Sequence, residues 1–501
     1  MSSQPSAGPS QQMTWSLACL TLVVGIGGSL QYGLHISIIN SPSKYIQHFM
    51  NQTWMDRYGL HFSQETVTFL WSLTVSIYSI GGLLGALLSG HLCVKYGRKR
   101  TLLCNNLVAI LAAVLMAISR RVGSFEVILL GRMLYGVNAG VGLNSHIMYI
   151  AECAPLKLRG MITVSASLFI AVGKLIGLAF GLSEFLSSEA AWPLLMASSG
   201  LPALLQLVTL PFFPESPRYL LIDMGDKEGC LKAMLQLWKG RDHTAEMIGM
   251  MEERKAINGA KPKGVVDLLR DHSVRRQLIV LLLVCGAIQF IGVNVVYFYA
   301  YDVFQNAGIA GSQIRYVSLG MAITEIFTII LCGSMIECFG RRTLLLGAYT
   351  LITVTLGLLT ATLTLQDVYS WMPYISTLLI FIFILSFGLG PGGVSCPLPT
   401  EIFLQSYRAA AVTLHGFLNW LGMFVLGLGF PFLVEWLGTY CFLIFLVYCL
   451  LMAVFTWMCV PETKGKTMLE IMEAFRHLNF QRWKKETDPE KNDFSIFATK
   501  L

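Results

Sequence analysis

Long apolar runs, rather than an alternation of polar and apolar positions, dominate the chain. The apolar core of a bilayer takes ~20 helical residues, and about twelve runs reach that length. They cover residues 17–39, 66–92, 101–119, 124–150, 161–182, 192–212, 277–303, 314–337, 343–364, 372–399, 409–436 and 440–460. The alternation typical of an outer-membrane barrel is absent. The pattern therefore predicts an all-helical membrane protein with twelve spans.

Composition supports this class. Of 501 residues, 54% are hydrophobic, and the mean hydropathy is +0.62. A soluble protein of this length could not cover so much apolar surface. Residues 1–16 contain no Lys or Arg, so the charged start of a cleavable signal peptide is missing. We expect the first apolar run to remain as helix 1.

The net charge of +7 is distributed asymmetrically. With both ends in the cytoplasm, most cations fall in cytoplasmic segments, as the positive-inside rule requires. The cations outside are Lys44, Arg57, Arg120, Arg121 and Arg315, and those within spans are Arg132 and Lys174. This distribution argues against nucleic acid as a partner. It also places the sequon Asn51-Gln52-Thr53 in an outer loop, where Asn51 is a candidate for glycosylation.

The twelve cysteines give no sign of a disulfide framework. They lie in spans, at span ends or in cytoplasmic segments, without pairs in outer loops. No Cys/His spacing suggests zinc, and we expect neither a metal nor a cofactor.

Three loops occur twice. YGRKRTLL (96–103) resembles FGRRTLLL (339–346), AECAPLKLRG (151–160) resembles TEIFLQSYRAA (400–410), and PESPRYL (214–220) resembles PETKGKT (461–467). All three repeats are offset by about 245 residues, which indicates an internal duplication. Such a duplication predicts two six-helix bundles related by an axis along the membrane normal.

The repeated loops carry acids as well as bases. We expect Arg98 to pair with Glu152 or Glu215, and Arg341 to pair with Glu401 or Glu462, when the cytoplasmic side is closed. The alternative is that the cations only anchor the topology. The full set of candidate gate residues is Arg98, Glu152, Arg159, Glu215, Arg218, Glu337, Arg341, Arg342, Glu401, Arg408 and Glu462.

These features divide the chain into five parts. We expect a cytoplasmic tail (1–16), a first bundle (17–220), a linker (221–275), a second bundle (276–462) and a C-terminal cytoplasmic tail (463–501). The linker is charged and lacks a long apolar run, which predicts short amphipathic helices.

The loops, together with GRMLYG (131–136) and GVNVVYFY (292–299), resemble the facilitative hexose transporters of the major facilitator superfamily. The resemblance covers residues ~15–480. LQYG, TEIFLQSYR and LTLQDVYSWMPYIS resemble the fructose-carrying branch, which includes urate-handling members. The resemblance implies a monomeric carrier in the plasma membrane that binds a sugar between its bundles and exposes it alternately to each side, without ion coupling.

The binding residues depart from the family pattern. Ser167 and Ile288 stand where the family has Gln, Leu178 replaces a second helix-5 Gln, and Met423 replaces an Asn. Cys396 stands where the glucose carriers have Trp. The candidate substrate-binding residues are Gln31, His35, Ser167, Gln289, Asn294, Tyr297, Cys396, Asn419 and Trp420. His35 is either a pocket donor or pH-sensitive group, or a histidine satisfied against a neighbouring helix.

Two charges lie inside spans, where an ionised side chain is costly and usually faces a cavity or a partner. Lys174 lies ~20 Å from the cytoplasmic end of helix 5, and Glu325 lies ~16 Å from the outer end of helix 8. In a core of ~30 Å these depths nearly coincide, so we expect an ion pair. It could tie the bundles together, bind an anion or a sugar, or couple transport to protons.

The leading interpretation is uniport of a hexose, fructose before glucose. A proton-coupled sugar carrier is disfavoured because helix 1 has no acid between Leu17 and Asn40. A urate or organic-anion carrier and a non-transporting sugar sensor remain as alternatives. No nucleophile–base pair or metal cluster suggests an enzyme.

Overall fold

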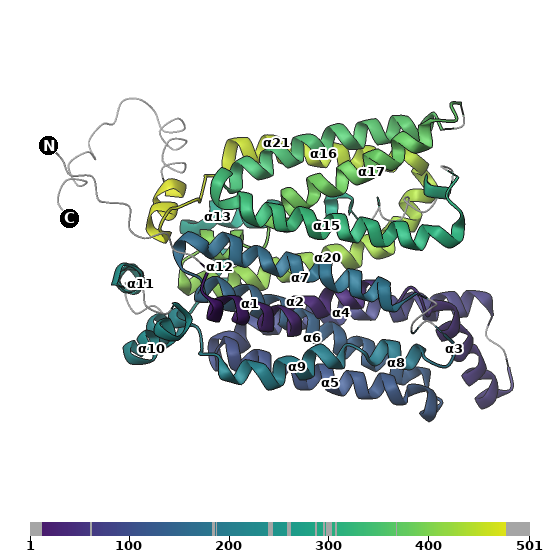
Figure 1. Cartoon of the computed structure of the whole chain (residues 1–501), viewed down its shortest axis with the longest axis horizontal. Helices are drawn as coiled ribbons and strands as arrows, with labels where there is room; N and C mark the ends of the chain where they lie inside the picture. The colour runs from purple at the N-terminus through teal and green to yellow at the C-terminus, as the bar shows by residue number, and fades with distance from the viewer. Residues whose placement is uncertain are drawn as a thin grey trace.

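The structure is a computed structural model and describes residues 13–60, 63–182, 186, 188–238, 244–257, 262–285, 288–293, 296, 303–305, 308–366 and 368–476. It is an all-helical molecule of two bundles, with the first bundle below and the second above in Figure 1. Helices α10 and α11 lie at one end, which we call the linker end, and α3 lies at the opposite end (Figure 1). The fold class predicted from the hydrophobic pattern is confirmed.

The first bundle and the linker follow the predicted order. The first bundle consists of α1 (Trp15–Gly27), α2 (Ser29–Ser37), α3 (Ser43–Tyr58), α4 (Gln64–Tyr96), α5 (Arg98–Val122), α6 (Phe125–Cys153), α7 (Arg159–Phe180), α8 (Trp192–Ala197) and α9 (Gly200–Thr209). The linker forms α10 (Lys227–Trp238), α11 (Thr244–Ile257) and α12 (Val265–Arg270). All three short helices lie within the predicted linker, residues 221–275.

The second bundle is also built from membrane-spanning helices. It consists of α13 (Arg275–Val280), α15 (Gly311–Phe339), α16 (Arg341–Thr364), α17 (Met372–Leu389), α18 (Pro391–Val394), α19 (Leu398–Ile402), α20 (Gln405–Leu437) and α21 (Cys441–Cys459). After α13 the chain continues through a π-helical turn, Leu281–Cys285, and a 3₁₀ turn, Ile288–Ile291. Part of the predicted span 277–303 lies outside the described residues.

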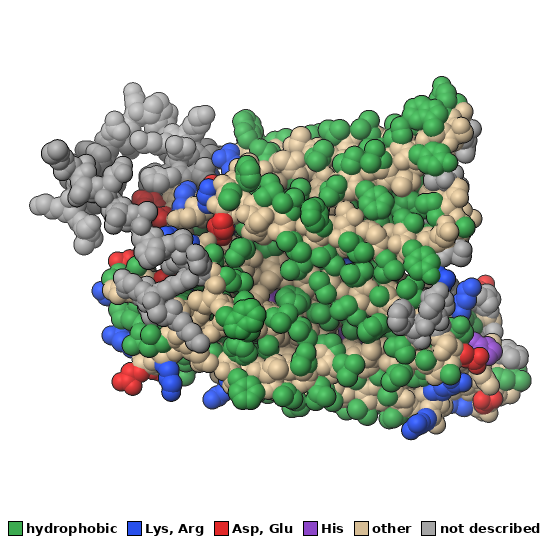
Figure 2. Space-filling view, viewed as in Figure 1, with side chains coloured by type: hydrophobic (Ala, Val, Ile, Leu, Met, Phe, Trp, Pro, Cys, Tyr) green, Lys and Arg blue, Asp and Glu red, His purple; other side chains and the backbone are tan. Residues whose placement is uncertain are grey.

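Eleven helical stretches of the described chain are long and apolar enough to cross a membrane. On the face shown in Figure 2, apolar side chains cover most of the middle of the molecule, whereas charged side chains gather toward the two ends. This arrangement matches a bilayer around the middle and water at both ends.

Besides the seventh predicted span, three others are not continuous α-helices. The first breaks at Gly28, between α1 and α2, and the tenth breaks at Gly390, between α17 and α18. Gly28 has φ −100° and ψ −98°, and Gly390 has φ −119° and ψ −97°, so both leave the helical region in the same way. The sixth is interrupted at Ser198 and Ser199, between α8 and α9.

The duplication is visible in the backbone of the basic loops. Gly97 has φ 88° and ψ 168°, and Gly340 has φ 87° and ψ 166°. A Cβ atom at Gly97 would lie 2.5 Å from Glu215 Oε2, and one at Gly340 would lie 2.4 Å from Glu462 Cδ. Each glycine thus supplies both a positive φ and room for a carboxylate at the start of the following helix.

Small residues let α4 and α6 pack closely. A Cβ atom at Gly140 would lie 2.2 Å from the carbonyl oxygen of Gly82, and one at Gly136 would lie 2.2 Å from that of Tyr78. Close backbone approach at glycines is a common way for membrane helices to associate.

We predict that Gly140→Ala destabilises the protein by about 1–3 kcal/mol, because the added methyl group overpacks the α4–α6 contact. The unfolding temperature in detergent measures this. Gly347→Ala is the matched control, since Gly347 also lies in a helix and a Cβ atom added there would meet nothing within 4 Å. Equal unfolding temperatures for the two variants would contradict the prediction.

Candidate functional site

A cavity of about 100 Å³ lies between the two bundles. A cavity needs about 10–15 Å³ to hold one water molecule, so this cavity has room for several. Helices α2, α6 and α7 of the first bundle and α15, α17, α18 and α20 of the second contribute to its wall. The lining residues are Tyr32, Ile36, Leu143, Ser167, Ile170, Lys174, Ile288, Gln289, Val293, Glu325, Ile329, Phe387, Gly392, Ser395, Cys396, His415, Asn419 and Met423.

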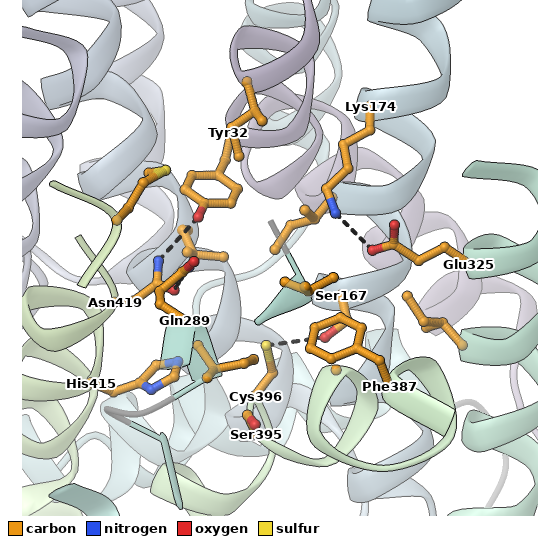
Figure 3. A pocket seen from close by; sticks show the side chains of 18 residues that line it. Tyr32, Ser167, Lys174, Gln289, Glu325, Phe387, Ser395, Cys396, His415 and Asn419 are labelled. Atoms are coloured by element: carbon orange, nitrogen blue, oxygen red, sulfur yellow. Dashed lines mark hydrogen bonds and ion pairs between the residues drawn. The ribbon is translucent and has the colours of Figure 1, made fainter. Parts of the chain in front are cut away.

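One side of the cavity carries a chain of polar groups, which we call the amide group: Tyr32, Gln289 and Asn419. Gln289 Nε2 donates to Asn419 Oδ1 at 2.9 Å. Asn419 Nδ2 donates to Tyr32 Oη at 3.2 Å (Figure 3). The chain joins α2 of the first bundle to α20 of the second. Amide and phenol groups both donate and accept, so this side can bind hydroxyl groups.

The opposite side of the cavity carries the predicted ion pair (Figure 3). Lys174 Nζ on α7 lies 2.8 Å from Glu325 Oε1 on α15, so this pair also joins the two bundles. Its side chains are 21% and 4% exposed. The contact predicted from matching depths is therefore present, whereas its role stays a prediction.

Between these two sides lie smaller polar groups. Ser167 Oγ donates to Cys396 Sγ at 3.2 Å, again from one bundle to the other. His415 Nδ1 has no hydrogen-bond partner among the described residues. His415 was not among the predicted site residues, although its spacing of four from Asn419 places both on one face of α20.

Three predicted binding residues lie beside the cavity rather than in its wall. Gln31 Nε2 donates to the carbonyl of Gly27 in the same chain segment, at 3.2 Å. The ring of His35 lies 3.9 Å from the ring of Tyr135, inside the first bundle. His35 is thus packed against a neighbouring helix, but neither of its ring nitrogens has a hydrogen-bond partner among the described residues, so its role stays a prediction.

The third of these residues, Trp420, is fully buried against the first bundle. Its ring lies 5.1 Å from that of Tyr32 and 5.2 Å from that of Tyr78, both edge-on. A Cβ atom at Gly82 would meet the indole at 2.2 Å, so α4 and α20 pack closely there. Trp420 thus packs against the Tyr32 ring and helps to fix its position beside the cavity.

The remaining predicted residues lie away from the cavity or outside the described part of the chain. Asn294 and Tyr297 lie outside the described residues. Asn51 lies within α3 and not in a loop, at the end opposite the linker. All twelve cysteines are unpaired, and no group of His, Cys, Asp and Glu that could hold a metal occurs in the described parts of the chain.

The predicted Arg–Glu pairs form, but each stays within one bundle. Arg98 Nη2 lies 2.8 Å from Glu152 Oε1, and Arg341 Nη2 lies 2.6 Å from Glu401 Oε1. All four side chains are almost completely buried. Because each pair joins elements of one bundle, its direct effect is to stabilise that bundle.

Glu215 and Glu462 bind helix N-termini. Glu215 Oε1 accepts from the backbone N–H of Arg98 at 3.1 Å. Glu462 Oε1 accepts from the backbone N–H of Arg341 at 2.9 Å. Glu215 and Glu462 thus contact the backbone of Arg98 and Arg341 and not the guanidinium groups, as expected for an anion at a helix N-terminus.

The two bundles are joined at the linker end by a set of polar residues, all buried except the half-buried Asp223, which we call the clamp: Arg98, Glu152, Arg218, Asp223, Glu253, Gln405 and Arg408. Gln405 Nε2 of the second bundle donates to Glu152 Oε1 at 3.0 Å and to Asp223 Oδ2 at 3.2 Å.

Helix α11 of the linker also takes part in the clamp. Glu253 pairs with Arg218 of the first bundle and accepts from the backbone N–H of Gln405 at 3.0 Å. Arg408 Nη2 lies 3.7 Å from Glu253 Oε1. The linker end is therefore closed among the described residues.

The remaining gate candidates have other contacts. Glu337 Oε1 accepts from the backbone N–H of Gly160 across the bundles, at 3.0 Å. Arg342 Nη2 donates to the carbonyl of Trp457 at 2.6 Å. Arg159 is buried, and its Nη2 has no hydrogen-bond partner among the described residues. The contacts of Arg342 and Arg159 within the described chain thus give no support to the predicted gate role of these two residues.

We predict that acidification weakens the clamp at Glu253. Burial raises the pKa of Glu253, but the charges of Arg218 and Arg408 outweigh burial and hold the pKa below its ordinary value of 4.5. The stabilisation by Glu253 is therefore present above about pH 4.5 and is lost as the pH falls through the lowered pKa. Burial raises the pKa of Asp223, which acts in the opposite direction.

The variant Asp223→Asn isolates the contribution of Glu253. Its unfolding temperature should fall as the pH is lowered from about 5 to about 3, whereas that of Asp223→Asn/Glu253→Gln should fall less. If the unfolding temperatures of the two variants change with pH by the same amount, the Glu253 carboxylate does not stabilise the clamp.

The paired bundles, the cavity between them and the duplicated loops define the class of protein, a membrane carrier with the major facilitator fold. The sequence profile of the family described as "Sugar (and other) transporter" matches residues 20–475. The chain belongs to this family, and the predicted resemblance is confirmed.

Among curated proteins the chain is similar to members of solute carrier family 2. It is 44% identical over 458 residues to facilitated glucose transporter member 11 of Homo sapiens, covering 91% of this chain and 92% of that protein. It is 42% identical over 468 residues to member 5 of Mus musculus, covering 93% of each. It is 41% identical over 478 residues to mouse member 9, covering 95% of this chain and 89% of that protein.

Solved structures share the fold. The proton:xylose symporter XylE bound to 6-bromo-6-deoxy-D-glucose has a TM-score of 0.77 at 22% identity, covering 92% of this chain and 98% of XylE. The inward-open conformation of XylE from E. coli has a TM-score of 0.64 at 23% identity, covering 91% and 99%. The likeness to these structures concerns the fold alone.

Proposed function

We propose that this protein carries a hexose, fructose before glucose, across the plasma membrane by facilitated diffusion. The observation that supports this most is the cavity between the bundles, where Tyr32, Gln289 and Asn419 present hydroxyl-binding groups beside apolar walls. Sugars need both, because their hydroxyls require partners and their ring faces are apolar. The carrier acts as a monomer and needs no cofactor.

Transport follows from alternating opening of the two ends. The clamp closes the linker end, which we assign to the cytoplasm together with both termini. Release of the clamp would let the bundles rotate about the cavity and open it to the cytoplasm. Asn51, at the opposite end, would then face the outside and be available for glycosylation.

Ion coupling is not part of the proposal. Helix α2 carries no carboxylate, and Glu325, the one carboxylate among the described cavity residues, already pairs with Lys174. A proton on Glu325 would leave Lys174 without its counter-charge, which is costly in a buried site.

Uptake into proteoliposomes tests this function. Labelled fructose, glucose and urate are offered in parallel, with and without a pH gradient. We expect saturable fructose uptake that does not respond to the gradient. Uptake of urate alone, uptake driven by the gradient, or no flux of any substrate would each refute the proposed uniport.

A further inference from the structure

The cavity has two polar sides, and the amide group accounts for only one. The other side is the Lys174–Glu325 pair, which faces the amide group across the cavity (Figure 3). The walls between them are mostly apolar, with Ile170, Ile288 and Phe387 among the lining residues. A ligand with hydroxyls at both ends could therefore contact both polar sides at once.

We propose that Lys174 and Glu325 form a second substrate subsite, which binds neighbouring hydroxyls of the hexose and determines which hexoses are carried. This proposal rests on the proposed function and adds a specific role for two residues. The amide group holds one end of the sugar, and the ion pair holds the other.

The position of the pair favours contact with a ligand. Both side chains line the cavity, and Lys174 remains 21% exposed there. A buried ion pair is weak evidence for stability, because apolar residues of the same size often stabilise a protein equally well. An ion pair beside a cavity that admits water can instead exchange contacts with a polar ligand.

The charge of the pair favours a neutral polyol over an anion. Lys174 and Glu325 are the only Lys, Arg, Asp or Glu among the described lining residues, and their charges balance. An anion bound to Lys174 would neutralise the ammonium group and so deprive Glu325 of its counter-charge. The side chain of Glu325 is only 4% exposed. Leaving a buried carboxylate unpaired is costly.

Hydroxyl groups avoid this cost. One hydroxyl can donate to the carboxylate while a neighbouring hydroxyl accepts from the ammonium, and the net charge of the site stays the same. Hydrogen bonds to charged groups are also stronger than those between neutral groups. Each hydroxyl held in this way should contribute about tenfold or more to affinity.

The test uses Lys174→Met/Glu325→Gln, which removes both charges together and leaves no unpaired ion. Binding to purified protein is measured for fructose and for analogues that each lack one hydroxyl. In the wild type, removal of a hydroxyl bound by the pair should weaken binding about tenfold or more. In the double variant the same removal should have little effect on affinity. Removal of any other hydroxyl should weaken binding as much as it does in the wild type.

A matched control removes an ion pair far from the cavity. Arg57→Met/Glu126→Gln breaks an exposed pair between α3 and α6, where Arg57 Nη1 lies 2.6 Å from Glu126 Oε1. This variant should discriminate among the analogues as the wild type does.

Each other outcome overturns the proposal. Equal weakening for all analogues, or full recovery by the charge swap Lys174→Glu/Glu325→Lys, would mean that the pair only ties the bundles together. Urate binding lost in the double variant would mean an anion site. Wild-type protein that binds no hexose would refute the proposed function itself. Equal affinity for fructose in the wild type and in the double variant would refute the subsite alone.

Discussion

Replacement of Glu152 by alanine is expected to open the linker end and to destabilise the protein by about 3–5 kcal/mol. Glu152 is completely buried and accepts from Arg98 and Ser216 of its own bundle and from Gln405 of the other. Without the carboxylate, Arg98 loses a buried counter-charge. Gln405 also loses one of its contacts across the linker end.

The duplication offers a control for this prediction. Glu401 is the equivalent residue of the second bundle, but it binds only Arg341 and Thr463 of that bundle among the described residues. Glu401→Ala should therefore lower the unfolding temperature without opening the linker end.

Spin labels on the exposed Lys157 and Glu470 measure the opening, after the exposed Cys104, Cys338 and Cys459 are changed to serine. The distance between the labels should increase in Glu152→Ala and stay unchanged in Glu401→Ala. An unchanged distance in both variants would show that Glu152 does not join the bundles.

Replacement of Gln289 by alanine is expected to weaken hexose binding by about tenfold to a hundredfold. The change removes a donor and an acceptor from the cavity wall, and Asn419 Oδ1 loses the N–H that it accepts at 2.9 Å. The affinity of purified protein for fructose measures the effect.

Gln277→Ala is the matched control, because Gln277 is also a buried amide but lies on α13, outside the cavity lining. It should leave affinity unchanged. Because Gln289 and Asn419 are bonded to each other, Gln289→Ala/Asn419→Ala should cost less than the product of the single effects. Unchanged affinity in Gln289→Ala would remove the amide group from the binding site.

The fold was predictable because two periodic features dominate the sequence. Apolar runs of bilayer length define the spans, and the repeated loops define the two halves. The broken helices at Gly28 and Gly390 were not predictable in the same way, since glycine is tolerated in continuous membrane helices as well. Only packing distinguishes the two cases, and hydropathy carries no information on packing.

The ion pair was predictable because an isolated charge in a membrane is costly. That cost requires a partner at the same depth, and Glu325 satisfies the requirement for Lys174. Depth along a span follows from residue number alone, so it can be estimated without knowledge of side-chain direction.

Direction around the helix was harder to predict. On α2, Tyr32 and Ile36 face the cavity, whereas Gln31 and His35 lie one position earlier and face the bundle. One residue turns the side chain by about 100°, so polarity alone selects the wrong face when the polar residues are buried inside a bundle. On α20 the spacing of His415, Asn419 and Met423 marks the correct face.

The clamp shows a second limit of sequence reasoning. The repeated Arg–Glu pairs suggested a gate that closes the cytoplasmic side, whereas repetition itself implies a role common to both bundles, which is their internal stability. The contacts between bundles bring residues of the repeated loops, such as Glu152 and Gln405, together with Glu253 on the linker, which has no equivalent in the repeat.

Few bonds among the described residues hold the linker end closed, and this bears on turnover. A carrier without an energy source must visit both of its end states in every cycle, so neither may be much more stable than the other. Gln405 contributes three hydrogen bonds to the first bundle and the linker, and Gly160 contributes one to the second bundle through its backbone. Arg408 adds longer ion pairs with Glu152 and Glu253, at 3.9 and 3.7 Å. All four hydrogen bonds go to carboxylates, where each contributes a net ~1.5–3 kcal/mol, so the conformation that is open at this end must gain contacts of similar strength if the carrier is to turn over.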